Sequence, residues 1–379
     1  MAPIHSRRTR RTFLQKTGAL LGGLALSGTP AATLASTQSV QRRTPLPPGM
    51  NPLGVALVGL GNYATNQLAP ALQETERCRL TGIVTGTPAK ADKWMAEYNI
   101  PGENVYNYET FDRIADNPDI DIVYVVLPNS MHAEYAIRAA EAGKQVITEK
   151  PMATSVRDCE RMIEACDKAG VKLSVGYRLH FEPHHQEIMR LAQEQVFGPV
   201  TVVEASFSFT SRNTEAWRFS KEMAGGGALL DVGVYAIQGA RYTIGEEPVR
   251  VRASGYNTRP DIFTEIYETI LWEMEFPGGA VSSHSTSYSA NVNRLYMMAP
   301  RGWARIEPAF MYNSVSGETN EGPMGYPHVT QQALQIDDFA RCITEDETSR
   351  VSGEEGLKDM KVIEAIYRSI DRNGRWVDV

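Results

Sequence analysis

The chain has 379 residues, of which 42% are hydrophobic and 22% are charged, an ordinary globular composition. This length predicts two domains, each large enough to bury a core of its own. The formal net charge is −7 and would be −12 without the five basic residues of segment 1–35, so we expect neither nucleic acids nor anionic membrane surfaces as partners.

The N-terminal region is predicted to lie outside the folded domains. A basic run from Arg7 to Lys16 precedes the apolar run Gly18–Ser27, which is too short to anchor the chain in a bilayer. The pair Arg10-Arg11, followed by Thr-Phe-Leu, resembles a twin-arginine signal, which exports folded, cofactor-loaded proteins. Residues 1–35 are therefore interpreted as a twin-arginine signal peptide for the periplasm; an ordinary secretory signal or a disordered basic tail is the alternative. Residues 36–53 are rich in proline and predict an extended arm.

The cysteines form neither a Cys-x-x-Cys pair nor a cysteine–histidine pattern of the kind that binds zinc. We therefore expect core thiols, with neither a disulfide nor a metal site. These residues are Cys78, Cys159, Cys166 and Cys342.

The first domain begins with the apolar strand Gly54–Val58, which runs into a glycine turn and an amphipathic helix. The turn, Gly59-Leu60-Gly61-Asn62-Tyr63-Ala64, has the Gly-x-Gly-x-x-Ala form of the dinucleotide fingerprint. Gly59 permits the tight turn, Gly61 lets the backbone approach the pyrophosphate, and Ala64 allows the helix to pack closely on the strand. This context favours a nucleotide site over a chance glycine turn.

The second strand, Leu80–Val84, ends at Thr85-Gly86, where an NAD site usually carries an acidic residue for the ribose hydroxyl. This turn has no acid. It carries hydroxyl side chains and is followed by Lys90, whose ammonium suits a 2′-phosphate. We therefore expect NADP rather than NAD, and the alternative is that Lys90 is a solvated helix residue.

The alternation of strand and helix continues to Val175. The apolar strand Ile120–Leu127 ends in Pro128-Asn129-Ser130, and Asn129 or Ser130 is a candidate cap for a helix with His132 in its first turn. Six strands alternating with helices predict a doubly wound parallel sheet, so residues 54–177 are interpreted as a dinucleotide-binding Rossmann domain. The other predicted elements are a helix through Trp94 and Tyr98, strands at Val105-Tyr106, Lys144–Thr148 and Lys172–Val175, and helices ending at Gly143 and Gly170.

The central strand delivers Glu149-Lys150-Pro151 to its carboxyl end, the edge at which α/β proteins bind ligands. Pro151 ends the strand because it cannot donate to the ladder. Lys150 is therefore a candidate for chemistry. Taken alone, however, the Glu149-Lys150 pair is better explained by a surface salt bridge.

After Tyr177-Arg178 the alternation gives way to a run of strands. Five alternating segments separated by glycine turns predict an antiparallel sheet, wide enough to wall a pocket or to pair with another subunit. Residues 178–379 are therefore interpreted as an α+β domain with a large, mostly antiparallel open sheet, which binds substrate and forms a homodimer or homotetramer. Asp231 and Tyr235 would share one face of a helix. The predicted strands are 200–209, 249–256, 267–276, 280–288 and 294–298, and the helices are 184–195, 331–343 and 356–369.

Together, these motifs resemble the glucose–fructose oxidoreductase / inositol dehydrogenase (Gfo/Idh/MocA) family over residues 50–375. The resemblance implies a Rossmann domain with an open-sheet domain, tightly bound NADP, and oxidation of a sugar at its anomeric carbon to a lactone. Two features depart from the family's exported, sugar-oxidising branch: the arm, residues 36–53, is shorter than the arm that clamps a neighbouring subunit's cofactor there, and Asn62 replaces a basic residue. The motifs are Gly59-x-Gly61-x-x-Ala64, Pro128-Asn129-x-x-His132, Glu149-Lys150-Pro151, Tyr177-Arg178 and Asp231-x-x-x-Tyr235.

The resemblance also implies roles for single residues. Lys150 would orient the sugar, Tyr235 would act as general acid/base, and Asp231 would bind or orient the sugar. The candidate substrate contacts are Tyr177, Arg178, His180, Trp217 and Arg218. The candidate cofactor contacts are Gly59, Leu60, Gly61, Asn62, Tyr63, Thr85, Gly86, Lys90, Tyr108, Leu127, Pro128, Asn129, His132, Glu149, Lys150 and Arg178. The structural alternatives are a packed aromatic for Tyr235, a helix cap for Asp231, a core aromatic for Tyr177, surface packing for Trp217 and Arg218, and structural histidines at 132 and 180.

The proposed chemistry requires Lys150 and Tyr235 to meet. The pKa of a tyrosine is ordinarily about 10, too high for a base at neutral pH. A lysine ammonium and a nicotinamide cation beside the phenol would lower that pKa. A two-domain layout allows the two residues to meet.

The predicted location constrains the reaction. A periplasm holds no dinucleotide pool, so an exported NADP enzyme has to retain and regenerate its cofactor. We therefore expect a ping-pong cycle in which one sugar leaves as a lactone and a second leaves as an alditol. The alternatives are an exported NAD-dependent glycosidase on the same fold, another exported sugar or cyclitol dehydrogenase, and a non-catalytic sugar-binding or scaffold protein.

Overall fold

The computed structural model describes Leu46 and residues 49–379. The predicted signal peptide and most of the predicted arm lie outside the described residues. Within the described part of the chain, every helix is too short or too polar to span a bilayer.

The first sheet of the described chain has six parallel strands in the order β3-β2-β1-β4-β5-β6. The order turns back between β1 and β4, and doubly wound sheets bind ligands in a crevice beyond the carboxyl ends of the two strands at such a point. We call this region of the chain the crevice. The strands are β1 Leu53–Val58, β2 Cys78–Val84, β3 Val105–Tyr106, β4 Ile122–Val125, β5 Gln145–Thr148 and β6 Leu173–Val175.

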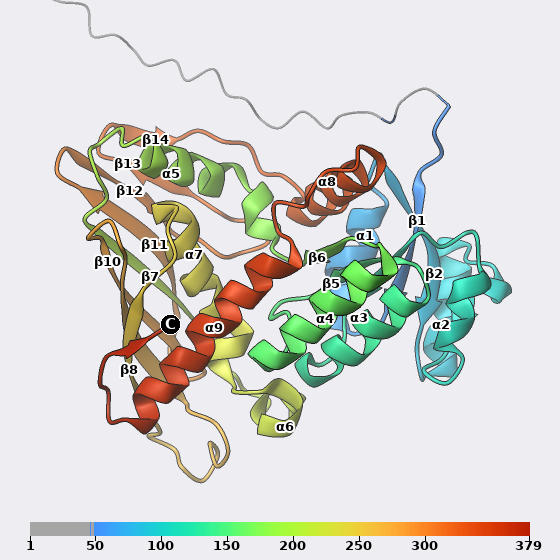
Figure 1. Cartoon of the computed structure of the whole chain (residues 1–379), viewed down its shortest axis with the longest axis horizontal. Coiled ribbons are helices and arrows are strands. Elements are labelled where there is room, and N and C mark those ends of the chain that lie inside the picture. The colour runs from blue at the N-terminus through green and yellow to red at the C-terminus, as the bar shows by residue number, and fades with distance from the viewer. Residues whose placement is uncertain (1–45, 47–48) are drawn as a thin grey trace, which may run out of the picture. The chain divides into compact units, whose positions relative to one another are not determined.

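Helices cover both faces of this sheet. α3 (His132–Glu141) and α4 (Val156–Ala169) pack side by side on one face (Figure 1). On the other face pack α2 (Pro88–Tyr98) and α1 (Ala69–Leu72), which continues the π-helical turn η1 (Ala64–Leu68). This arrangement confirms the doubly wound parallel sheet predicted from the alternation of strands and helices.

The predicted cap of α3 is wrong. Asn129 and Ser130 lie in a 3-10 turn, η4 (Asn129–Met131), and Met131 precedes α3 without a side-chain cap. Both residues lie in the turn before Met131, too far ahead of α3 to cap its first N–H groups. The Asn129 amide donates to the carbonyl of Ala224 at 2.9 Å instead. Asn129 therefore ties this loop to α6 (Lys221–Ala224).

The second sheet of the described chain has nine strands in the order β14-β13-β12-β11-β7-β10-β9-β8-β15. The five predicted strands correspond to β7–β11, whereas β12–β15 were not predicted because they are short and partly rich in glycine and proline. The pairing is antiparallel except between β7 and β10, which run parallel, and β10 is the third strand of the antiparallel meander β8-β9-β10. The strands are β7 Val202–Ser208, β8 Arg250–Tyr256, β9 Thr269–Glu275, β10 Val281–Ser287, β11 Val292–Ala299, β12 Gly302–Ile306, β13 Gly317–Thr319, β14 Gly322–Met324 and β15 Val377–Asp378.

One face of the second sheet is covered by helices. α7 (Val234–Ile244) packs on β7, β10 and β11 and contacts α5 (Pro183–Gln193). The chain enters α7 through a π-helical turn, η7 (Leu229–Gly233), which carries Asp231. Such turns are frequent at functional sites.

The last two helices join the two sheets. α8 (Gln331–Thr344) packs its apolar side into the core formed by β1, β2 and α1, although it belongs to the predicted second domain (Figure 1). α9 (Gly353–Asp371) runs between α4 and β8. The four cysteines are buried free thiols, as predicted.

Candidate active site

Lys150 follows β5 and reaches across to the π-helical turn η7. Its Nζ donates to the main-chain carbonyl of Asp231 at 2.6 Å and lies 3.7 Å from Asp231 Oδ1. The same Nζ lies 5.0 Å from the centre of the Tyr235 ring. The structure therefore brings together the three residues predicted to be catalytic. Lys150 pairs with Asp231, so the surface salt bridge with Glu149 is not formed.

The Asp231 carboxylate is held by donors from separate segments. The hydroxyl of Tyr288, just after β10, donates to Oδ2 at 3.0 Å, and Arg218 Nε donates to the same oxygen at 3.0 Å. Oδ1 faces Lys150 and is the oxygen left to accept a hydrogen bond from a ligand. The helix-cap alternative for Asp231 is wrong, since neither η7 nor α7 has a side-chain cap.

Trp217 and Arg218 lie on the outer side of Asp231, in the 3-10 turn η6 (Trp217–Phe219). Arg218 Cζ lies 4.5 Å from the centre of the Trp217 ring, a cation–π contact that holds the guanidinium paired with Asp231. Both side chains are half-buried. Their place at the rim is compatible with the predicted contact with substrate.

Tyr235 is 4% exposed, and burial raises the pKa of its phenol. The group that opposes this rise most is the Arg178 guanidinium, 5.1 Å from the ring centre, whereas the Glu149 carboxylate adds to it. The sequence predicted a lysine ammonium as a cation that lowers this pKa, whereas the protein cation that lowers it most is Arg178. Arg178 has that role because it lies against the ring from the buried side.

Arg178 was predicted to contact the sugar and the nucleotide, but its side chain is buried in the protein interior. Its side chain is 1% exposed, Nη2 donates to the carbonyl of Phe310 at 2.7 Å, and Nη1 donates to the carbonyl of Met311 at 3.1 Å. Nη1 also donates to the Gln331 side chain. Because both terminal nitrogens have protein partners in the interior, Arg178 acts on Tyr235 rather than on a bound ligand.

Tyr177 and His180 are placed among α7 and α9 rather than beside Lys150. Tyr177 is 1% exposed, and its pKa is raised by burial and by the nearby Asp359 carboxylate of α9. His180 packs on Tyr242 with ring centres 3.8 Å apart, and burial lowers the pKa of His180 to about 3. The predicted sugar contacts of both residues do not fit this place, and the core-aromatic alternative fits Tyr177.

Two tyrosines that sequence reasoning missed complete the site. Tyr288 binds Asp231, and Tyr312, from the loop after β12, lies 5.8 Å from the Tyr63 ring and 4.4 Å from Arg178 Cζ. Tyr312 therefore connects the glycine turn to the second sheet. Neither residue belongs to a motif, and the only hint is that Tyr288 ends a predicted strand.

Glu149 lies beneath the same cluster. It is 7% exposed, accepts a hydrogen bond from the Tyr124 hydroxyl at 2.7 Å, and accepts the main-chain N–H of Lys150 at 3.2 Å. Burial raises the pKa of this carboxyl. A Cβ on Gly176 would lie 2.6 Å from Glu149 Oε1, so glycine at 176 makes room for the carboxylate.

The glycine turn has the form that a dinucleotide requires. Gly59 has φ +94°, and a Cβ there would lie 2.6 Å from the carbonyl oxygen of Val126, so only glycine fits. A Cβ on Gly61 would meet no atom of the described residues within 4 Å, so this backbone faces space that a pyrophosphate can enter. Lys90 Nζ donates to the carbonyl of Leu60 at 3.0 Å, which places a positive charge beside the turn. These residues fit a dinucleotide with a 2′-phosphate.

Further predicted cofactor residues border the same crevice. Thr85 is buried at the end of β2, and a Cβ on Gly86 would lie 3.1 Å from the Tyr108 ring. The Leu127 side chain lies against Gly59, since a Cβ there would be 2.7 Å from Leu127 Cδ2. Asn62 is exposed in the turn, and Pro128 begins the loop beside Leu127.

His132 faces the protein backbone rather than the crevice. It is 1% exposed, and its ring nitrogens Nδ1 and Nε2 lie 2.9 Å from the carbonyl oxygen of Pro151 and 2.8 Å from that of Leu127. Its predicted contact with the cofactor therefore does not fit, because both nitrogens are occupied by main-chain oxygens.

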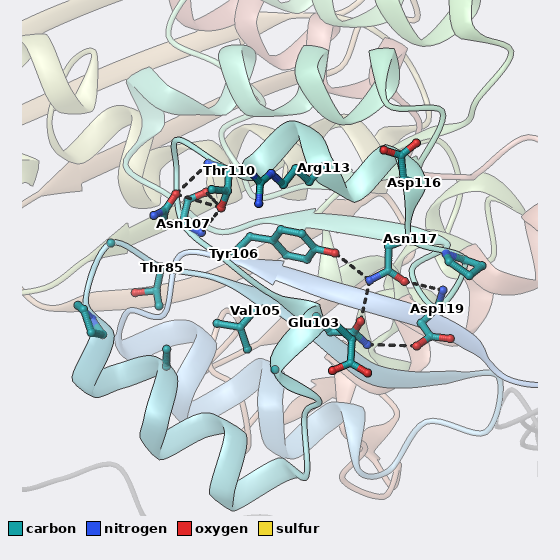
Figure 2. A pocket seen from close by; sticks show the side chains of 16 residues that line it. Thr85, Glu103, Val105, Tyr106, Asn107, Thr110, Arg113, Asp116, Asn117 and Asp119 are labelled. Atoms are coloured by element: carbon teal, nitrogen blue, oxygen red, sulfur yellow. Dashed lines mark hydrogen bonds between the residues drawn. The ribbon is translucent and has the colours of Figure 1, made fainter.

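A groove of about 990 Å³ lies apart from Lys150, Asp231 and Tyr235. It runs along the free edge of β3 and includes Thr85 and Gly86 in its lining. Figure 2 shows the Asn117 amide turned toward the Tyr106 hydroxyl, to which it donates at 2.8 Å. Because the groove lining contains none of Lys150, Asp231 and Tyr235, it is not the reaction site.

Comparison with known proteins gives a consistent result for both halves of the chain. Residues 53–177 match a family model described as an oxidoreductase family with an NAD-binding Rossmann fold, and residues 185–305 match the GFO/IDH/MocA C-terminal domain. The crystal structure of an aldose–aldose oxidoreductase from Caulobacter crescentus is 43% identical, with a TM-score of 0.85 over 87% of this chain and 100% of that chain.

Two curated archaeal proteins are also similar. The D-xylose 1-dehydrogenase [NADP(+)] of Haloarcula marismortui is 28% identical over 331 residues, covering 84% of this chain and 91% of that protein. The D-xylose 1-dehydrogenase (NADP(+)) 2 of Haloferax volcanii is 26% identical over 324 residues, covering 83% and 96%.

Proposed function

The chain belongs to the GFO/IDH/MocA oxidoreductase family, and from that premise we propose that it is an exported, NADP-dependent sugar oxidoreductase. It oxidises an aldose at C1 to the lactone and reduces a second sugar to an alditol while the nucleotide stays bound. The observation that carries the proposal is the cluster of Lys150, Asp231 and Tyr235 at the carboxyl end of β5. The C. crescentus aldose–aldose oxidoreductase and the archaeal NADP-dependent xylose dehydrogenases support sugars as substrates.

The nucleotide is held by the residues that border the crevice. The backbone of Gly59–Tyr63 would approach the pyrophosphate, Thr85 and Lys90 would hold the 2′-phosphate, and Leu127–Asn129 would lie beside them. When bound, NADP supplies the hydride acceptor and donor. The absence of an acidic residue after β2 and the position of Lys90 favour NADP over NAD.

The site residues divide the work of sugar oxidation. Lys150 has three donors, of which one is used on the carbonyl of Asp231, so the others can hold the sugar oxygen at C1. Asp231 Oδ1 accepts from a sugar hydroxyl while Arg218 and Tyr288 hold Oδ2. Tyr235 takes the proton of the C1 hydroxyl and returns it to the second sugar. This proton transfer needs the phenolate form of Tyr235, and Arg178 favours that form because its positive charge lowers the pKa of the phenol.

The first test is the nucleotide content of the purified protein. We expect denaturation to release NADP or NADPH, and we expect an aldose to increase the reduced-nicotinamide absorbance of the intact protein and a second sugar to discharge it. Protein that needs added NADP+ and turns over one sugar only would be a simple dehydrogenase instead. Hydrolysis of a chromogenic glycoside would identify the NAD-dependent glycosidase.

Two variants separate a catalyst from a sugar-binding protein on the same fold. Lys150→Met and Tyr235→Phe should retain the nucleotide and lower kcat by roughly 10²-fold or more, the range expected for loss of acid/base or orienting groups. Unchanged turnover in both variants would contradict the assignment of the site.

Export is tested through the sequence of the predicted signal peptide. Replacing Arg10-Arg11 by Lys-Lys should retain the precursor in the cytoplasm, because twin-arginine export depends on the arginine pair. Cell fractionation measures this directly. Processing and export that continue unchanged would point to an ordinary secretory route.

A further inference from the structure

His132 lies between two loops that serve different parts of the site. It is the first residue of α3, and its ring is enclosed between the ends of β4 and β5. Nδ1 lies 2.9 Å from the carbonyl oxygen of Pro151, the residue after Lys150. Nε2 lies 2.8 Å from the carbonyl oxygen of Leu127, whose side chain touches Gly59 of the glycine turn. One side chain thus contacts both the lysine loop and the wall of the nucleotide crevice.

The two contacts compete for one proton. Both partners are carbonyl oxygens, which accept hydrogen bonds, and a neutral imidazole has one N–H. Burial lowers the pKa of His132 by more than the Pro151 and Leu127 carbonyls raise it, and the charge of Lys150 lowers it further, so a second proton is disfavoured. In the neutral ring the tautomer decides which of the two carbonyls is bonded. The Nδ1–H form donates to the carbonyl of Pro151, next to Lys150, and the Nε2–H form donates to the carbonyl of Leu127, beside the glycine turn.

We propose that His132 is a positioning residue that couples the nucleotide crevice to Lys150, with one ring nitrogen assigned to each. This inference rests on the proposed function, in which Lys150 orients the sugar. The bond to Pro151 sets the reach of Lys150, whose Nζ must extend to Asp231 on the opposite side of the site. The bond to Leu127 sets the wall that lies against the glycine turn. Displacements of about 1 Å in such a constellation change rates by up to roughly 10²-fold.

Two substitutions reproduce the two tautomers separately. In His132→Asn the amide nitrogen stands near the position of Nδ1, so the bond to Pro151 is kept and the bond to Leu127 is lost. In His132→Gln the amide nitrogen reaches the position of Nε2, so the reverse holds. We expect bound NADP to leave His132→Asn about tenfold faster on dialysis than it leaves the original protein, while kcat of the loaded enzyme stays within a few-fold of the original. We expect His132→Gln to retain NADP affinity and to lower kcat by tenfold or more.

The matched control is His284, a second buried histidine with both ring nitrogens bonded, to the carbonyl of Ala205 and to the Ser282 hydroxyl. His284→Asn and His284→Gln should lower the melting temperature without changing kcat or NADP affinity. If the two His132 variants instead lose affinity and kcat in parallel, or change neither, the proposal is overturned. The binding measurement also separates the two proposals. A protein that turns over no sugar fails the proposed function, while the contrast in NADP affinity between the two variants still decides the coupling.

Discussion

Among single residues, Arg178 has the clearest effect on the chemistry. Its guanidinium is the group that most lowers the otherwise raised pKa of Tyr235. Tyr235 must lose its proton to act as a base, so removing this cation should raise the pH at which sugar oxidation reaches half its maximum. We expect Arg178→Gln to shift the kcat profile toward higher pH. Arg178→Lys keeps the charge and should shift it less; identical profiles would show that another group titrates.

Lys90 should determine the preference for NADP over NAD. Its side chain is exposed on α2, and its ammonium lies beside the glycine turn through the bond to Leu60. Lys90→Ala should weaken NADP binding by about tenfold and leave NAD binding unchanged, because one cation facing the 2′-phosphate is lost. Lys93, exposed on the same helix and paired with Glu97, provides the control. Equal loss for both nucleotides would exclude contact with the 2′-phosphate.

His284 should couple stability to pH. Its ring is 6% exposed, and burial lowers its pKa from the ordinary 6.5 to about 3. The neutral ring therefore contributes its full stability above pH 6.5, and this contribution is lost as the pH falls from 6.5 toward 3. The loss is a few kcal/mol at most, at ~1.4 kcal/mol per unit. Urea unfolding of His284→Asn should show a weaker dependence on pH in this range, while the exposed His328→Gln should match the original protein.

At the scale of elements, the two glycines of the glycine turn have different roles: Gly59 is needed for folding and Gly61 for nucleotide binding. Gly59→Ala should destabilise the protein, because its φ is +94° and the new Cβ would clash with the carbonyl of Val126. Gly61→Ala should leave the melting temperature of the nucleotide-free protein unchanged but weaken NADP binding, because its Cβ would enter the space open to the pyrophosphate. Calorimetry and thermal unfolding of both variants test this. A Gly61→Ala protein that binds NADP normally would contradict the placement of the pyrophosphate.

At the scale of the whole molecule, we propose that a second copy of the chain covers the outer face of the second sheet. Leu271 and Val281 are 44% and 43% exposed there, beside the cross-strand ion pairs Arg252–Glu273 and Arg250–Glu275. Exposed apolar residues flanked by both charges suit a self-complementary interface. Leu271→Arg should convert a dimer or tetramer into smaller species in light scattering. Arginine at the exposed Ala115 serves as the control, and a monomeric original protein would refute the proposal.

The sequence by itself determined the elements whose patterns are local. The six parallel strands, the glycine turn and the strands β7–β11 follow from hydrophobic period and turn residues, which depend on neighbours within a few positions. The short strands β12–β15 and the parallel pairing of β7 with β10 were not predictable, since pairing partners are set by how distant segments pack. Export, retention of NADP and self-association stay predictions.

Only the tertiary structure decided how the site is assembled. Lys150 is predicted from the end of its strand, but its partner Asp231 comes from η7, in the other half of the chain. In the structure Tyr288 and Tyr312 lie in the site, where Tyr177 and His180 were predicted. The cation beside the Tyr235 ring on its buried side is Arg178. The physical reason is that a motif records what one segment can do locally. Which side chains share a buried site, and which charges face them there, depends on the packing of segments far apart in the chain.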